Sequence, residues 1–392
     1  MSSKRVLRRH LCFVLLVLLG GQSARAADLD KTKLAEIDAA VAGAIKRGEC
    51  PGAVVAVVHA DAVVYRKAFG NRSVKPDEAV MTPDAVFDMA SLTKPVATGT
   101  SVMLLVQQGK LKPEDLVSKH WPEFAANGKD KVTVEHLLLH TSGLIADNDI
   151  RDYADGRAKA LERVAGLKLE APAGTRFKYS DVGFIVLGEL VERLSGTPLD
   201  QFAKKNVFEP LKMTDSGYSP AAALKARVAP TGPRDGGIIL GAVHDPRAFK
   251  MGGVAGHAGL FSTADDMVRY CRMLLRDGEL DGVRVLDAKT VKLFTEPHDV
   301  PVADKAPKGL KGSRSFGWDV DTSFSAPRGD RFKKGEGYGH TGFTGTSVWV
   351  DPRSKTAIII LTNRVHPSDK GNASPLRREV ANIVAAAVGE KK

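Results

Sequence analysis

Two residues three positions apart, Ser91 and Lys94, have the spacing of a nucleophile and its base in the 392-residue sequence. Residues at this spacing lie on the same side of a helix, so the lysine amine can reach the serine hydroxyl. The apolar run Val96 to Leu105 follows, which predicts that Ser91 lies in the first turn of a buried helix. Such a tetrapeptide also occurs by chance, and the alternative is a capping serine beside a solvated lysine.

The chemistry expected of this pair depends on its electrostatic surroundings. Free N–H groups at a helix start stabilise negative charge, so an oxyanion developing at Ser91 would be favoured there. Burial by the same helix should lower the pKa of Lys94, because a buried amine is more stable uncharged. A neutral Lys94 could then accept the serine proton, as nucleophilic catalysis requires.

Tyr179 is a second candidate, on a predicted loop before the apolar helix that starts near Gly183. A tyrosine there can present its hydroxyl to a cleft, where Lys94 and a second cation would lower its pKa and let it move protons. The alternative is a packed aromatic ring beside an aspartate helix cap at Asp181.

The third candidate is the triplet His340, Thr341 and Gly342, which precedes Phe343 and a predicted strand. A Thr-Gly strand edge can lie beside an extended substrate and donate its backbone N–H groups. The N–H of Phe343 would complete an oxyanion pocket with the N–H of Ser91. The alternative is a glycine-rich turn that enters a hairpin.

In this order, the three segments resemble the serine β-lactamase and penicillin-binding protein superfamily. Its signature is Ser-x-x-Lys, then Tyr-x-Asn or Ser-x-Asn, then a Lys-Thr-Gly-like triad. The stretches 137–144, 177–183 and 252–266 look like the same group. The resemblance extends from about Leu34 to the predicted C-terminal helix, which is nearly the whole of the predicted mature chain.

The resemblance implies a role for each candidate. Ser91 would attack a carbonyl, while Lys94 and Tyr179 exchange the proton. The N–H groups of Ser91 and Phe343 would form the oxyanion hole. The residues implied in substrate binding are Asp181, His340, Thr341 and Gly342, of which His340 and Thr341 would meet a terminal carboxylate.

Two positions depart from the commonest pattern of this superfamily. Asp181 replaces the asparagine whose amide usually binds the acyl-side carbonyl, and a carboxylate cannot donate that hydrogen bond unless it is protonated. His340 replaces the usual lysine. A histidine there resembles certain DD-peptidases and class C-like esterases more than efficient β-lactamases, while the acyl-serine mechanism is unaffected.

The elements that must position these residues predict an α+β fold. The patterns indicate a helix over 29–47, a hairpin of strands 53–59 and 62–69, a second hairpin of strands 346–350 and 356–361, and a final helix over 375–388. We expect one antiparallel β-sheet flanked by the N- and C-terminal helices, with a largely α-helical inserted domain, as in β-lactamases and DD-peptidases.

The predicted domain organisation follows from these elements. Residues 1–26 are a signal peptide and residues 27–388 form a β-lactamase-related domain. That domain divides into an α/β part, about 29–90 and 315–388, and a helical insertion, about 91–314. The insertion contains predicted helices over 96–108, 133–140, 184–194 and 264–275, and its linkers 221–241 and 300–317 are expected to border the active site.

The N-terminal segment predicts a periplasmic or secreted protein. Basic residues, an apolar run over 11–19 and the sequence Ala24-Arg25-Ala26 form a secretory signal, with cleavage after Ala26. It carries five of the 57 Lys and Arg residues and none of the 46 Asp and Glu, which leaves a net charge of +6. No later segment approaches the roughly 20 apolar residues of a membrane span. The remaining charge is scattered, which gives nucleic-acid binding no support.

Other reactive side chains favour structural interpretations. Cys50 and Cys271 could pair in an oxidising compartment, but a chain of this length builds a core without a disulfide. His136 and His140 have the spacing of a metal pair but lack a third ligand, so we expect no metal and no cofactor. His244, Asp245 and His257 are expected to border the cleft and to serve in structural hydrogen bonds.

The sequence thus predicts a serine hydrolase with an acyl-enzyme on Ser91, in the first place a D-alanyl-D-alanine carboxypeptidase-like peptidase. An esterase and a weak β-lactamase share this mechanism and stay open. A protein of another class, a non-catalytic muropeptide-binding sensor, would not need all of Ser91, Lys94 and Tyr179. We expect a monomer whose partner is a small peptide or ester, such as a peptidoglycan stem peptide.

Overall fold

The computed structural model describes residues 29–302 and 312–390. The predicted signal peptide, residues 1–26, lies outside this part of the chain. Among the described residues, none of the helices combines the length and the apolar character needed to cross a membrane.

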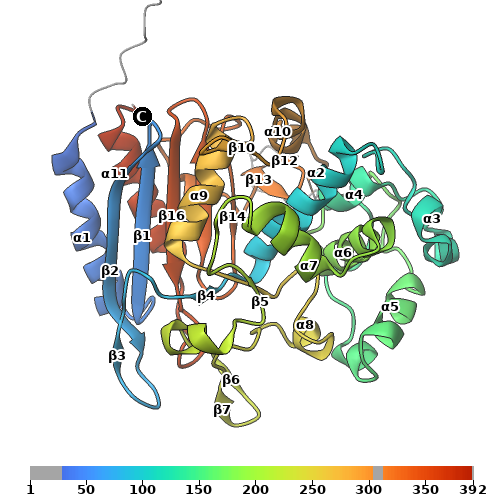
Figure 1. The fold of residues 1–392 in the computed structure, drawn as a ribbon, viewed down its shortest axis with the longest axis horizontal. Helices are drawn as coiled ribbons and strands as arrows, with labels where there is room; N and C mark the ends of the chain where they lie inside the picture. The colour runs from blue at the N-terminus through green and yellow to red at the C-terminus, as the bar shows by residue number, and fades with distance from the viewer. Residues whose placement is uncertain (1–28, 303–311, 391–392) are drawn as a thin grey trace, which may run out of the picture.

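One antiparallel sheet of nine strands forms the left half of the molecule (Figure 1). Both predicted hairpins, β1–β2 and β15–β16, are present and share this sheet, so the expected fold class is confirmed. The strands in spatial order are β11 (His298–Asp299), β12 (Ser313–Ser315), β13 (Trp318–Asp321), β14 (Tyr338–Thr341), β15 (Ser347–Asp351), β16 (Thr356–Thr362), β1 (Gly52–His59), β2 (Ala62–Ser73) and β3 (Ala79–Val80).

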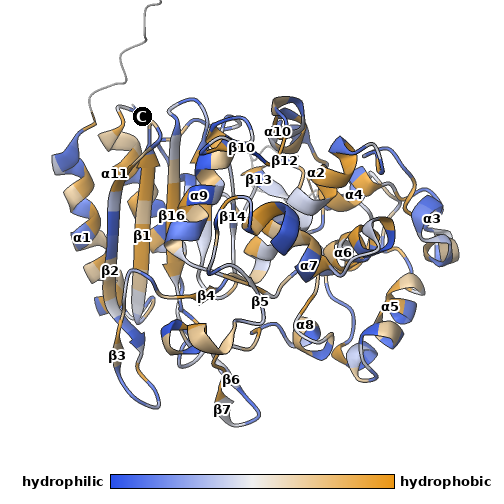
Figure 2. Cartoon of the chain, viewed as in Figure 1, coloured by the Kyte–Doolittle hydropathy of each residue, from blue (hydrophilic) through white to orange (hydrophobic). Residues whose placement is uncertain are grey.

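The terminal helices cover one face of this sheet. They are α1 (Lys31–Lys46) and α11 (Ser374–Ala387), which pack against each other. On β1, Val55 and Val57 face these helices, while Val54 and Val58 face the larger core on the opposite side. Successive strand residues point to opposite faces, so a strand covered on both faces has an unbroken apolar sequence, which appears as the orange of β1 in Figure 2.

The right half of the molecule is mainly helical (Figure 1). Its central helix is α6 (Asp181–Ser195), which carries Asp181 at its first position. The other helices of this half are α2 (Thr100–Gln107), α3 (Val117–His120), α4 (Val134–Leu138), α5 (Arg157–Ala165), α7 (Leu199–Ala203), α8 (Pro246–Lys250) and α10 (Ala288–Thr295), of which α2, α3, α4 and α7 contact α6. The helix α9 (Ala264–Leu275) lies instead against β16 and β1 of the large sheet (Figure 1).

Several short strands come from the stretch 91–314 that we expected to be helical. It supplies β11 and most of β12 to the large sheet, and strands of two or three residues are too short to show a period of two in the sequence. A three-stranded sheet joins β4 (Phe87–Asp88) to β8 (Leu260–Ser262) and β5 (Gly217–Tyr218). Two further hairpins are β6 (Pro233–Arg234) with β7 (Gly237–Ile238), and β9 (Glu279–Leu280) with β10 (Val283–Arg284).

The segment that carries Ser91 differs from the simple helix start that we predicted. Ser91 lies in a single 3-10 turn, Ala90–Leu92, which is followed by a wide π-type turn, Lys94–Gly99, before α2 begins. Pro95 has no N–H to donate within this segment, which accounts for its departure from regular α-helix.

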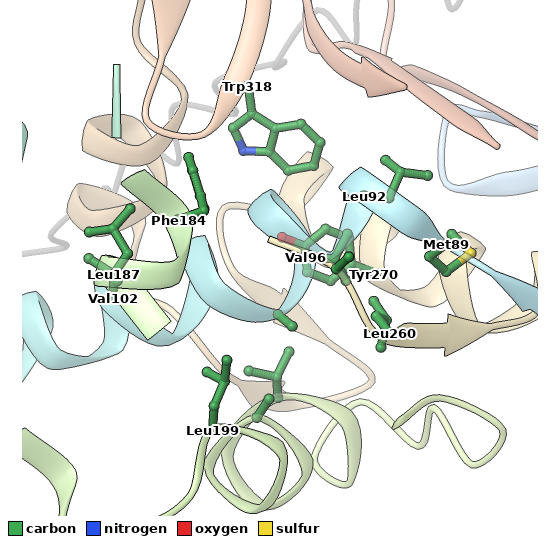
Figure 3. Packing of buried hydrophobic residues seen from close by; sticks show 14 of the residues in the cluster. Met89, Leu92, Val96, Val102, Phe184, Leu187, Leu199, Leu260, Tyr270 and Trp318 are labelled. Atoms are coloured by element: carbon green, nitrogen blue, oxygen red, sulfur yellow. The ribbon is translucent and has the colours of Figure 1, made fainter. Parts of the chain in front are cut away.

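Buried apolar side chains pack around the segment that carries Ser91 (Figure 3). Leu92 and Val96 are fully buried and belong to the same cluster as Tyr270 of α9 and Trp318 of β13. Because protein cores are close-packed, this arrangement restricts movement of the Ser91 turn relative to the sheet.

The two cysteines of the described residues lie in different cores. Cys50 packs with the terminal helices, whereas Cys271 lies in the larger core on the other side of the sheet. Both are free, and burial raises the pKa of each thiol. They therefore behave as packed apolar side chains rather than as nucleophiles.

Candidate active site

The Lys94 ammonium lies at the centre of the site and contacts three acceptors. Its Nζ donates to Ser91 Oγ and to the carbonyl oxygen of His257, at 3.0 Å each, and lies 2.6 Å from Asp181 Oδ1. The Lys94 side chain is 0% exposed. An ammonium group has three N–H bonds, so the three acceptors match a charged Lys94.

The predicted lowering of the Lys94 pKa is wrong. Burial does favour the neutral amine, but the negative charge of Asp181 and its hydrogen bond to Lys94 outweigh it and raise the pKa above its usual value. The sequence showed the burial but not the carboxylate that meets Lys94. Lys94 is therefore a cation in the resting protein and must lose a proton before it can act as a base.

Close backbone packing brings the His257 carbonyl to Lys94. The preceding residue, Gly256, lies against α6, where an added Cβ would be 1.9 Å from the oxygen of Phe184 and 3.0 Å from the nitrogen of Gly188. The Gly256 oxygen also accepts a 2.7 Å hydrogen bond from the Thr98 hydroxyl. Only glycine fits this approach, so α6 and the Lys94–Gly99 turn together fix the position of the carbonyl.

The variant Gly256→Ala is expected to lower the free energy of unfolding by about 1–3 kcal/mol and to slow the reaction of Ser91 with a fluorophosphonate. The new methyl group must displace the loop, which moves the His257 carbonyl away from Lys94. Thermal unfolding and labelling rates test both effects. Gly217→Ala is the matched control because its Cβ would meet nothing within 4 Å, and equal behaviour of the two variants would contradict the assignment.

Tyr179 lies beside Ser91 and Lys94, held by a stack of rings. Its ring lies 4.4 Å from the ring of His140 and 5.2 Å from that of Phe324, between centroids, and Lys94 Nζ lies 5.0 Å from the Tyr179 centroid. Burial raises the Tyr179 pKa although the charge of Lys94 opposes it, so the predicted lowering is wrong. A neutral phenol beside Ser91 can donate a proton but does not start as a base.

His140 supports this loop in a way that the sequence did not reveal. Its Nδ1 accepts a 3.0 Å hydrogen bond from the N–H of Ser180, and its carbonyl accepts one of 2.9 Å from Lys178. Burial, with the charge of Arg314 adding to it, lowers the His140 pKa well below its usual value. A neutral His140 thus fixes the backbone on both sides of Tyr179. The segment 137–144 resembled the family, but the resemblance did not indicate that His140 bonds to the backbone of Ser180.

The N-terminus of α6 presents Asp181 to Lys94. Ser180 caps the helix, since its hydroxyl accepts a 3.1 Å hydrogen bond from the N–H of Gly183 and donates one of 2.7 Å to the oxygen of Ile145. A carboxylate in the first turn of a helix is stabilised by the free N–H groups and the helix dipole. The helix cap is therefore Ser180, and Asp181 is available to pair with Lys94.

The turn between β14 and β15 is tied to the backbone before Ser91. The hydroxyls of Thr344 and Thr346 donate to the carbonyls of Asp88 and Met89 at 2.7 and 3.0 Å. At Gly342 an added Cβ would lie 2.5 Å from the Met89 oxygen, so glycine permits this approach. These contacts hold the strand edge that carries Thr341 close to the Ser91 turn.

His340 lies on β14 as predicted but is uncharged. Burial, followed by the charges of Arg314 and Lys94, lowers the His340 pKa well below its usual value. Its Nδ1 lies 2.9 Å from the Thr341 carbonyl, which can only accept, so Nδ1 carries the proton of the neutral ring. A neutral His340 brings no positive charge to a substrate carboxylate, unlike the lysine that is usual at this position.

Two cavities meet at Ser91. The first, of about 460 Å³, extends past Tyr179, His340 and Phe343 towards α11. The second, of about 330 Å³, extends towards α8 and is also lined by Ser91, Tyr179 and Phe343. The first is bordered by the arginines Arg314, Arg364 and Arg377 together with Asp319, and the second by the carboxylates Asp147, Asp181 and Asp245 together with Arg247. The predicted nucleophile, Tyr179 and Phe343 thus lie between two cavities of different charge.

The carboxylates and the histidine beside Lys94 are poorly suited to bind a metal ion. Asp181, Asp245 and His257 each offer one ligand atom, and these atoms lie within 4.8 Å of one another. However, Asp181 pairs with the Lys94 cation, and Asp245 Oδ1 lies 2.9 Å from His257 Nε2. An added cation would lie next to the ammonium of Lys94, so we assign no metal to these residues.

The sequence model of the family described as Beta-lactamase matches residues 37–382. The chain belongs to the β-lactamase family. A relative from Bacillus subtilis (strain 168), named "N-acetylmuramyl-L-alanine amidase", is 33% identical over 381 residues, which cover 88% of this chain and 84% of the relative. A relative from Escherichia coli O157:H7, named "Putative D-alanyl-D-alanine carboxypeptidase", is 33% identical over 355 residues, covering 81% of this chain and 79% of the relative.

A solved structure extends this result to the fold. The penicillin-binding protein homologue from Caulobacter crescentus superposes with a TM-score of 0.73 at 22% identity, covering 91% of this chain and 97% of that one. The mixed fold with its antiparallel sheet is thus that of β-lactamases and penicillin-binding proteins. The chain is a member of a family of β-lactamase-fold serine hydrolases.

Asp181 differs from the asparagine that is usual at this position in the β-lactamase family. The family's usual asparagine would be neutral, whereas Asp181 brings a carboxylate to 2.6 Å from Lys94 Nζ. The Asp181 carboxylate therefore raises the pKa of Lys94, which a neutral asparagine would not do.

Proposed function

We propose that this protein is an exported serine hydrolase that removes the terminal residue of peptides ending in D-Ala-D-Ala through an acyl-enzyme on Ser91. The observation that carries the proposal is the 3.0 Å contact between Lys94 Nζ and Ser91 Oγ at the meeting point of two cavities. The Escherichia coli relative supports the substrate class through its name.

The reaction begins when Lys94 has lost its extra proton. The Ser91 hydroxyl gives its proton to the Lys94 amine as Oγ bonds to the carbonyl carbon, and the N–H groups of Ser91 and Phe343 hold the oxyanion. The peptide C–N bond then breaks, and the leaving amine takes a proton from Lys94 through the neutral Tyr179 phenol. Water then attacks the ester carbonyl and gives a proton to the neutral Lys94, and Lys94 passes that proton to Ser91 Oγ as the acyl C–O bond breaks and the carboxylic acid leaves.

The strand edge of β14 and the start of α6 would hold the substrate. Thr341 and Gly342 lie on the first-cavity side. Because β13 pairs with β14 only between Asp319 and Gly339, an extended peptide can run beside the Thr341 end of β14. Asp181 and His340 border the substrate on either side of Ser91, with His340 acting as a neutral ring. These assignments follow the family pattern and the positions of the residues in the two cavities.

A second candidate function is amide cleavage between a muramyl group and L-alanine. The Bacillus subtilis relative with that name matches 88% of this chain. The acyl-serine chemistry would be the same, and the two candidates differ in the groups on either side of the broken bond. Ester and β-lactam hydrolysis would also use the same residues.

A substrate panel separates these candidates. The mature protein is incubated with a D-Ala-D-Ala peptide, a muramyl peptide, a p-nitrophenyl ester and a chromogenic cephalosporin, and a fluorophosphonate label is mapped by mass spectrometry. We expect release of D-alanine to be fastest and the label to lie on Ser91. Ser91→Ala provides the blank, and Ser219→Ala, at an exposed serine outside both cavities, is the matched control.

Other results of this panel would favour a different hypothesis. Faster cleavage of the muramyl peptide would replace the first candidate by the second. A label on Ser91 without turnover of any substrate would favour the muropeptide sensor. A Ser91→Ala protein that turns over every substrate like the unchanged protein would contradict the acyl-serine mechanism itself.

A further inference from the structure

Asp88 is a buried carboxylate, three residues before Ser91, that the proposed reaction does not use. It ends β4, is 2% exposed, and is not among the residues that line the two cavities. Burial raises the pKa of Asp88 to about 6, so the group is charged at neutral pH. A buried charge is costly unless hydrogen bonds satisfy it. The partners of its two oxygens therefore indicate what this carboxylate holds in place.

One oxygen of Asp88 holds the residue that precedes Ser91. Asp88 Oδ1 accepts a 2.8 Å hydrogen bond from the N–H of Ala90. Ala90 has a φ of 46°, a left-handed conformation that is unfavourable for a residue with a Cβ. An aspartate that accepts from the N–H two residues later stabilises such a turn. The Ser91 N–H belongs to the peptide unit that joins Ala90 to Ser91, so its direction depends on this turn.

The other oxygen of Asp88 holds a segment that contacts Phe343. Asp88 Oδ2 accepts a 2.6 Å hydrogen bond from the N–H of His244. The His244 ring stacks on the Phe343 ring, with 5.7 Å between the centroids and 22° between the planes. The guanidinium carbon of Arg364 lies 4.4 Å from the same Phe343 centroid. The Phe343 side chain is 52% exposed, so these two neighbours restrict a ring that the core does not hold.

The main chain of Asp88 supports the same region. Its carbonyl oxygen accepts the hydrogen bond of the Thr344 hydroxyl, and Thr344 is the residue after Phe343. Asp88 is thus connected to Phe343 through the His244 ring and through the neighbouring threonine. A carboxylate suits the double contact with two N–H groups because both of its oxygens accept. An asparagine has one accepting oxygen and would turn its NH₂ group towards the second N–H.

We propose that Asp88 is a positioning residue that aligns both donors of the oxyanion hole, the N–H groups of Ser91 and Phe343. One carboxylate oxygen fixes the turn before Ser91, and the other holds His244 against Phe343. The inference rests on the proposed function for the assignment of these two donors. Such donors act only if they are in place before the negative charge develops, and a displacement of about 1 Å can cost about a hundredfold in rate.

The variant Asp88→Asn tests the alignment with phenylboronic acid. Ser91 Oγ adds to the boron atom, and the tetrahedral adduct places an oxygen in the oxyanion hole. We expect the affinity for phenylboronic acid, measured by calorimetry, to fall about tenfold to a hundredfold. The kcat for the best substrate of the panel should fall by a similar factor, while KM changes by less than about twofold. Destabilisation alone would not produce this difference between kcat and KM.

Asp266→Asn is the matched control. Asp266 is 5% exposed, burial raises its pKa to about 6, and it accepts hydrogen bonds from the N–H of Asp215 at 2.9 Å and the hydroxyl of Ser216 at 2.8 Å. It lies outside the linings of both cavities. The control removes the same charge from a similar setting and should leave the phenylboronic acid affinity unchanged. An Asp88→Asn protein with the affinity of the unchanged protein would overturn the proposal.

Two variants of His244 test the contact with Phe343 and decide the matter if Asp88→Asn does not fold. His244→Ala keeps the N–H that Asp88 binds but removes the ring, so the affinity for phenylboronic acid should fall severalfold. His244→Phe restores a ring and should recover most of that loss. Burial lowers the pKa of His244, so the ring is uncharged at neutral pH and the exchange removes no charge. Equal affinities of His244→Ala and the unchanged protein would overturn the role of His244.

The same measurements distinguish failure of this inference from failure of the proposed function. If Ser91 of the unchanged protein reacts with neither phenylboronic acid nor a fluorophosphonate, the acyl-serine mechanism is wrong and the inference fails with it. If Ser91 reacts and Asp88→Asn binds phenylboronic acid normally, only the inference fails. Because the boronic acid needs no natural substrate, a protein that does not cleave D-Ala-D-Ala still gives a decisive result.

Discussion

Replacing Lys94 with methionine is expected to lower kcat/KM about a thousandfold for any substrate that the protein turns over. Methionine fills much of the same buried volume but removes the group that contacts Ser91 Oγ at 3.0 Å. Tyr179 cannot take over as the base, because burial raises its pKa and it stays neutral. Steady-state kinetics and the rate of fluorophosphonate labelling measure the loss.

The variant should also lose stability, for a separate reason. Removing Lys94 leaves the Asp181 carboxylate without its cation, but Asp181 is 19% exposed and borders a cavity, so water can solvate it in part. We expect a decrease of about 1–3 kcal/mol in the free energy of unfolding.

The double variant Lys94→Met with Asp181→Asn separates base chemistry from charge pairing. It should recover most of the stability that Lys94→Met loses, because the unpaired carboxylate is gone, and none of the activity. Recovery of activity in the double variant would show that Lys94 is not the base.

Asp181→Asn alone is expected to move the acid limb of the pH–rate profile to lower pH by about one to three pH units. Lys94 accepts a proton only when neutral, and the Asp181 carboxylate raises its pKa. Removing that negative charge lowers the Lys94 pKa, so the neutral amine is present at lower pH. At a pH below the limb, the rate should rise about tenfold for each pH unit that the limb moves.

Labelling of Ser91 by a fluorophosphonate, followed as a function of pH, measures this movement of the limb without a natural substrate. Asp147→Asn is the control, because it removes a carboxylate from the same cavity that pairs with Arg247 rather than with Lys94. Its profile should move much less. An acid limb that stays in place in Asp181→Asn, or that moves to higher pH, would contradict the effect of Asp181 on Lys94.

Short-range patterns predicted much of the architecture. The valine-rich run of β1, the turn at Ala60 and Asp61, and the helices α1 and α9 follow from local periodicity, and their observed bounds differ from the expected ones by a few residues or fewer. The spacing of Ser91 and Lys94 predicted their contact, since both residues lie in consecutive helical turns.

The charge of the site could not be predicted in the same way. A pKa depends on groups that the fold brings close, and Asp181 reaches Lys94 only because α6 begins beside the Ser91 turn. The sequence predicted the burial of Lys94, with a solvated lysine as the alternative, but it gave the wrong direction for the Lys94 pKa. Arg314 and Arg377 gave no local signal, because the buried donors that their guanidinium groups leave unpaired become apparent only in three dimensions.

The double-sided burial of β1 has a consequence for how the chain finds its register. When both faces of a strand are apolar, sliding it by one residue exchanges one apolar set for another, so hydrophobicity alone does not prevent a misaligned pairing. The alignment is instead set by turns at one end of the sheet. Ala60 and Asp61 both have positive φ, 48° and 70°, as a two-residue hairpin turn requires.

The Ala60 N–H also donates to the Lys355 carbonyl at 3.0 Å, in the turn that joins β15 to β16. Two adjoining turns thus set the pairing of β1 with β2 and of β15 with β16. The strand β14, which carries Thr341, pairs with β15, so its alignment depends on that of β15. The alignment of the strand edge beside Ser91 is therefore decided at polar turns outside both active-site cavities.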